Sequence, residues 1–113
     1  MTQPVACAAL VRFENCPALL SCSGDEDRTT QSLRRQALSQ ALAAPTDLTV
    51  DLSDLGFADT SLMLDLMMVA GRLRQTGRAM RLHGAQPQIQ RLIELVGLHR
   101  LPGVIVVTPA GAL

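Results

Sequence analysis

The chain has 113 residues, 48% of them hydrophobic and 2% aromatic, and its ten arginines balance ten acidic residues to a net charge of zero. This length and apolar content predict one folded domain, residues 1–113, with a core of aliphatic side chains. The scarcity of aromatic residues and the lack of a basic cluster argue against base stacking and an electropositive surface, so we expect neither nucleic acid nor a membrane as a partner.

The first elements are predicted to form a β-hairpin. An apolar stretch at residues 6–13 predicts a first strand, the sequence at 14–17 a turn that contains a proline, and residues 18–22 a second strand. The sequence Ser-Gly-Asp-Glu-Asp at residues 23–27 is then expected to be a polar loop.

A first helix is expected after this loop. Thr29 or Thr30 is a suitable N-cap residue, and the helix runs to about Ala43 with apolar residues at helical spacing. The residues expected to face solvent are Arg34, Arg35 and Gln36.

A central strand and a second helix follow. Pro45 ends the first helix, and the alternation of apolar and polar residues from Leu48 to Leu52 predicts a central strand that leads into a short turn. The second helix is expected from about Ser61 to Gln75, with Gly77 as its C-terminal stop.

The last third of the chain contains the clearest local signals. Met80–His83 is predicted to be a strand and residues 84–86 a turn. Pro87 is expected to be the first residue of a third helix that ends at Gly97, and residues 104–107 a last strand. The order β-β-α-β-α-β-α-β predicts an α/β fold, a mixed sheet of four to five strands with three or more helices packed on it.

Five short segments stand in an order and at a spacing typical of one known family. They are Gly24-Asp25-Glu26-Asp27, Val50-Asp51-Leu52-Ser53, Phe57-Ala58-Asp59-Thr60-Ser61, Gly77 and Leu95-Val96-Gly97-Leu98. Over residues 6–107 the chain thereby resembles the STAS domain, and within it the bacterial anti-sigma factor antagonists. The resemblance implies a STAS-like fold.

The resemblance also implies a function and a site. Such proteins are cytoplasmic regulators that bind an anti-sigma factor, often a serine kinase, and so free a sigma factor. The kinase phosphorylates the hydroxyl residue after the motif Asp, binding is then lost, and a phosphatase restores it. By this likeness Thr60 is the phosphorylated residue, with Ser61 as second choice. Asp59 is the preceding acid, and Asp27 the loop acid near the acceptor.

One position departs from the family pattern. The family usually has glycine after the two hydroxyl residues, and this chain has Leu62. A branched side chain is expected to hinder the close approach of a partner backbone, which a glycine would allow. Leu62 therefore favours an alternative function, a STAS subunit of a larger signalling assembly that is not phosphorylated or that senses a small ligand.

The second helix has its own pattern. A helical wheel predicts a core face and an opposite, solvent-facing side that includes Ser61, Asp65 and Arg72. The core residues are Leu62, Leu66, Val69, Ala70 and Leu73. Leu64, Met67 and Met68 fit neither side and are either ordinary surface or peripheral core residues or a contact patch beside Thr60. The residues expected to bind the partner are Asp27, Asp59, Ser61, Leu62, Leu64, Met67 and Met68. The same patch would also suit a homodimer.

Catalysis and metal binding have little support. His83 and His99 have no companion at metal-ligand spacing, the acids at 25–27 are adjacent and do not converge, and no nucleophile motif occurs. We expect a protein that is not an enzyme and has no cofactor and no metal.

The cellular compartment is inferred from cysteines and leader signals. Cys7, Cys16 and Cys22 are odd in number and lack the spacing of a disulfide framework or a zinc site. The first residues lack a signal peptide's basic segment, and no apolar run approaches the ~20 residues that span a bilayer. We therefore expect a cytoplasmic location.

Overall fold

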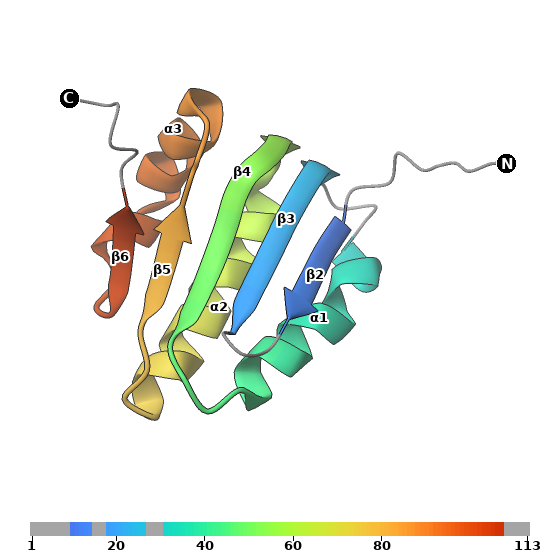
Figure 1. Ribbon diagram of the computed structural model, residues 1–113. Coiled ribbons are helices and arrows are strands. Elements are labelled where there is room, and N and C mark those ends of the chain that lie inside the picture. The colour runs from blue at the N-terminus through green and yellow to red at the C-terminus, as the bar shows by residue number, and fades with distance from the viewer. Residues whose placement is uncertain (1–9, 15–17, 27–30, 108–113) are drawn as a thin grey trace, which may run out of the picture.

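The computed structural model describes residues 10–14, 18–26 and 31–107 (Figure 1). The strands are β2 (Leu10–Glu14), β3 (Leu19–Glu26), β4 (Leu48–Ala58), β5 (Met80–His83) and β6 (Val104–Val107). The helices are α1 (Gln31–Ala43), α2 (Thr60–Gln75), α3 (Pro87–Val96) and the short 3₁₀ helix η2 (Leu98–Arg100).

The strands form one mixed sheet in the order β2-β3-β4-β5-β6. The pair β2 and β3 is antiparallel, and the other three pairs are parallel. Each parallel pair is joined through a helix, because a parallel connection must return the chain to the other end of the sheet. The structure thus confirms the predicted fold class and order of elements.

The core lies between the sheet and its helices. Figure 1 shows α1 and α2 behind the sheet, on a single face. Along β5, buried Met80 and Leu82 alternate with exposed Arg81 and His83, as expected for a strand with one buried face. Along β5 the uncovered face of the sheet is therefore polar, and the aliphatic side chains turn toward the helices.

Two strands are longer than the sequence predicts. The supposed loop at 23–26 belongs to β3, and the supposed turn after Leu52 belongs to β4, which runs to Ala58. These two strands pair with each other up to Glu26 opposite Ala58, with register shifts along the way. Backbone pairing satisfies the polar peptide groups and overrides the turn-like composition of both segments. Predictions for residues 6–9, 15–17 and 27–30 lie outside the described residues.

Among the described residues, no strand pairs with the other side of the β4 extension, since β5 pairs only as far as Asp51. Two glutamines take the place of that strand. Gln86 Nε2 donates to the Ser53 carbonyl at 3.1 Å, and Gln88 Nε2 donates to the Gly56 carbonyl at 3.1 Å. The start of α3 therefore holds the segment that leads into α2.

The helix ends agree with the local signals. Pro87 is at the first turn of α3, and Gly97 ends that helix with a left-handed φ of 81°. Gly77 follows α2, also with a positive φ. Within the described segments, none of these helices has both the length and the apolar content to cross a membrane.

Candidate functional site

The acid of the helix-start motif caps α2. Asp59 has extended backbone angles, and its Oδ1 accepts a hydrogen bond from the Ser61 backbone N–H at 2.9 Å. The Ser61 hydroxyl donates to the same oxygen at 2.6 Å. A carboxylate in this place satisfies an unpaired N–H group and lies at the positive end of the helix dipole.

The two hydroxyls after Asp59 have different surroundings. Ser61 is half-buried, and its Oγ both donates to Asp59 and accepts from Arg34. Thr60 is the first residue of α2 and is exposed, and no hydrogen bond of its hydroxyl occurs among the described residues. Of the two residues, Thr60 is the more exposed.

The predicted exposure of Arg34 is wrong. Arg34 was expected to face solvent, but its side chain is only 1% exposed. Its Nε donates to Asp65 Oδ2 at 2.8 Å, and its Nη2 donates to Ser61 Oγ at 3.1 Å. The signal was present in the spacing, because Ala37, Leu38 and Ala41 follow Arg34 at the intervals of one helix face.

The partner of Arg34 was also expected to face water. The Asp65 side chain is 19% exposed and forms an ion pair with Arg34. We call Asp59, Ser61, Arg34 and Asp65 the Arg34 network. It joins α1 to the first turns of α2 and meets the requirement that a buried charge be paired and hydrogen-bonded.

Apolar side chains flank Thr60 along α2. Leu64, one helical turn after Thr60, is 59% exposed, and Met68, one turn further, is 47% exposed. Met67 is only partly buried. Of the α2 residues predicted to contact a partner, Leu64 and Met68 are thus exposed, whereas Met67 packs against the core. We call Leu64 and Met68 the α2 patch.

A second apolar area lies at the end of β4 and on α3, and the sequence pattern did not predict it. Phe57 is 51% exposed at the end of β4, and Leu95 is 76% exposed on α3. With Leu92 they line a groove of about 210 Å³ beside Ala58. The sequence contained one indication of this area, the aromatic residue Phe57 three positions before the expected phosphorylation site.

Leu62 does not contact a partner on this surface. Its side chain is 0% exposed, because it shares the buried face of α2 with Leu66 and Leu73. Its assignment to the partner-binding residues is therefore wrong. The obstruction expected from its branched side chain is also wrong, since that side chain points into the core. Asp27 lies outside the described residues.

Among the described residues, no cluster of three or more histidine, cysteine, aspartate or glutamate side chains has the arrangement to hold a metal ion. Cys22 is buried on β3. The site around Thr60 consists of one exposed hydroxyl, a capped helix start and apolar flanks.

A family model described as "Mlab, STAS domain" matches residues 9–107. No curated protein matches the sequence. Among solved structures, the chain resembles the anti-sigma factor antagonist SpoIIAA in its unphosphorylated form, with a TM-score of 0.71 and 18% identity over 91% of this chain and 92% of that one.

The chain also resembles the phosphorylated form of SpoIIAA, described as a Bacillus cell fate determinant, with a TM-score of 0.66 and 18% identity over 91% of this chain and 96% of that one. A protein from Shewanella loihica with a SpoIIAA-like fold matches at a TM-score of 0.52 and 13% identity over 92% and 87% of the two chains. At these identities the likeness shows the fold alone, and it agrees with the predicted one.

Proposed function

The chain belongs to the STAS domain family. We propose that it is an anti-sigma factor antagonist, which binds an anti-sigma factor that is a serine kinase and so releases a sigma factor. Support comes from the SpoIIAA structures, which carry that description and are known in an unphosphorylated and a phosphorylated form. The chain itself acts as a binding partner and a kinase substrate, not as an enzyme.

The observation that carries this proposal is the exposed residue Thr60 with exposed apolar side chains before and after it in the chain. The α2 patch follows it on the helix, and Phe57 precedes it on β4. Exposed apolar residues gathered around a modifiable hydroxyl suit an interface that a charge can control. We propose Leu64, Met67 and Met68 as the main contacts, with Asp59 and Ser61 at the rim.

The chemistry of the switch follows from the position of Thr60. A phosphate adds a charge of about −1.5 to −2. At the first residue of α2 the helix dipole and the unpaired N–H groups tolerate that charge, so the fold is kept. The Asp59 carboxylate repels it, and an apolar interface cannot bury it without a large desolvation penalty. Binding is then lost until a phosphatase removes the group.

One observation favours a second candidate function. The matching family model is described as the Mlab STAS domain and its description does not mention an anti-sigma factor antagonist. The alternative is a STAS subunit that binds its partner through the same surface without being phosphorylated. A homodimer through the α2 patch is a third use of that surface.

The first test is intact-mass and fragment mass spectrometry after incubation with ATP and the candidate anti-sigma kinases of the host. We expect one phosphoryl group on the wild type and on Ser61→Ala, and none on Thr60→Ala. Absence of phosphate on wild-type protein that demonstrably binds the kinase refutes the switch and favours the second candidate.

Binding is tested in parallel with two matched variants. Met68→Asp and Ile105→Asp each place a carboxylate at a side chain that is about equally exposed, 47% and 46%. Met68 lies in the α2 patch, and Ile105 lies on β6. Calorimetric titration with the partner should show weakened binding for Met68→Asp and unchanged binding for Ile105→Asp. Equal binding of both variants would exclude the α2 patch from the interface.

A further inference from the structure

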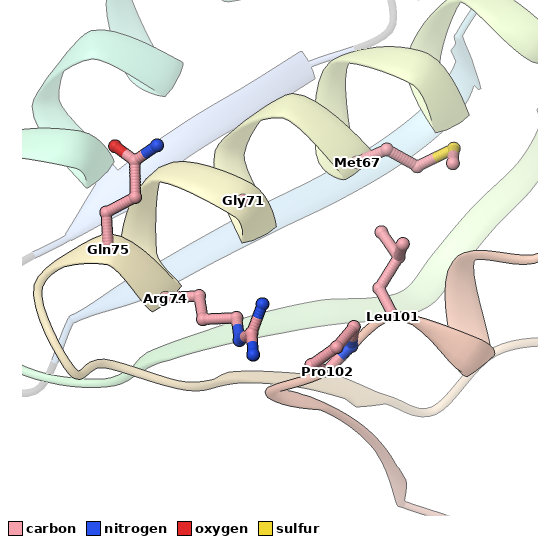
Figure 2. Close-up of a pocket in the computed structure, with 6 residues that line it drawn as sticks. All are labelled: Met67, Gly71, Arg74, Gln75, Leu101 and Pro102. Atoms are coloured by element: carbon pink, nitrogen blue, oxygen red, sulfur yellow. The ribbon is translucent and has the colours of Figure 1, made fainter.

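A second concave surface lies along the C-terminal part of α2, about 10 to 22 Å along the helix from Thr60. It has a volume of about 490 Å³, within the usual range of small-molecule sites, about 300–1,000 Å³. It is lined by Met67, Gly71, Arg74, Gln75, Leu101 and Pro102 (Figure 2).

Gly71 makes this groove. It lies in the interior of α2, where glycine is a poor helix former and needs a reason. Close packing within the chain is not that reason, because a Cβ built on Gly71 would meet nothing within 4 Å. The missing side chain leaves an open floor between Met67, one turn before, and Gln75, one turn after. The helix backbone is thereby accessible to a ligand.

The lining has an apolar part and one cationic end. Met67, Leu101 and Pro102 supply apolar surface, and Figure 2 shows the Arg74 side chain next to Pro102 while the Gln75 amide points away from it. The nearby Arg78 already has hydrogen-bond partners within the chain, since its guanidinium donates to Thr76 Oγ1 at 2.7 Å and to the Leu42 carbonyl at 3.1 Å.

Arg74 is exposed and makes no hydrogen bond or ion pair with any of the residues that the structure describes. A guanidinium beside apolar surface matches a ligand with one anionic group and an apolar body. We propose that the Gly71 groove binds a small organic anion, with Arg74 holding the anionic group and Met67, Leu101 and Pro102 contacting the apolar body. This inference does not depend on phosphorylation of Thr60.

The test is an NMR titration of isotope-labelled full chain with hexanoate, and with 1-hexanol as its neutral counterpart. We expect saturable shifts of the amide signals of Gly71, Arg74 and Leu101 with hexanoate. Affinity should be in the millimolar range, since the probe has few atoms. Hexanol should bind about tenfold more weakly, because it lacks the charge-assisted hydrogen bond to Arg74.

Three variants separate the groove from its surroundings. Gly71→Leu fills the floor and should abolish the shifts, while its unfolding temperature stays at or above that of the wild type because the helix gains a better helix former. Arg74→Gln should lower the affinity for hexanoate to that for hexanol. Arg72→Gln removes a neighbouring exposed charge that does not line the groove and should leave binding unchanged.

Three results would overturn the proposal. The shifts fail to saturate or scatter over the sheet, Gly71→Leu leaves them unchanged, or hexanol binds as well as hexanoate. The last result would show that the groove holds the apolar body alone and that Arg74 does not bind an anionic group.

Discussion

Removing the Arg34 charge tests the structure at its least expected feature. In Arg34→Met the apolar stem is largely kept, while the ion pair with Asp65 and the hydrogen bond to Ser61 are lost. Breaking a buried ion pair by removing one partner costs about 3–5 kcal/mol of unfolding free energy. Because the Asp65 side chain is 19% exposed, water reaches the stranded carboxylate, and we expect about 2–3 kcal/mol.

The double variant separates charge from packing. Replacing both partners of a buried pair by apolar residues is often neutral, so Arg34→Met with Asp65→Leu should recover most of the loss. We therefore expect a coupling energy of about 1–3 kcal/mol between the two positions. Urea unfolding should be followed by circular dichroism, since the chain contains neither tryptophan nor tyrosine for fluorescence.

The matched control is Arg35→Met, which removes an exposed arginine from the adjacent position of α1. It should change the unfolding free energy by less than about 0.5 kcal/mol. A loss below about 1 kcal/mol in Arg34→Met, or additive effects in the double variant, would refute the claim that Arg34 is buried and paired with Asp65.

Further predictions use the same unfolding assay. Asp59→Ala should cost about 1 kcal/mol through loss of the α2 cap, and an unchanged midpoint would argue against that cap. Gly84→Ala should cost about 2–3 kcal/mol, because φ is +76° and the new Cβ would lie 2.9 Å from a serine Cβ. Gly77→Ala has a similar φ but free space, and should cost about 1 kcal/mol, so equal losses would contradict the close contact. Leu62→Ala should cost about 2–5 kcal/mol, whereas Leu64→Ala should cost less than about 0.5 kcal/mol and weaken partner binding. The reverse order would place Leu62 on the surface.

The sequence predicts an element best where residues within that element determine its bounds. The bounds of α3 follow from Pro87 at its start and Gly97 at its end, and β5 follows from strict alternation. The extension of β4 was missed because its polar residues imitate a turn. What makes it a strand is distant in the chain, namely pairing with β3 and two glutamine side chains at the start of α3.

The residues of the candidate site also divide into those that one segment of the sequence predicts and those that depend on distant contacts. Thr60 and its exposed neighbours on α2 follow from a motif and a helical wheel, which are properties of one segment. Arg34 was missed because its residue type suggested solvent, although its spacing placed it on the buried face of α1. Asp65 and Ser61 on the facing helix supply partners for the buried guanidinium, and a single sequence does not show which helices face each other.

These placements limit how phosphorylation of Thr60 would act. The first turns of α2 are fixed from two sides, since Leu62, Met63 and Leu66 are 0% exposed and the Arg34 network ties Ser61 and Asp65 to α1. Thr60 lies outside both constraints. A phosphate there adds charge to the surface without a buried contact to disrupt, so melting of α2 is not needed to end binding. The proposed switch therefore works by electrostatic and desolvation penalties within the interface, and a partner that keeps its apolar contacts but tolerates the charge would escape it.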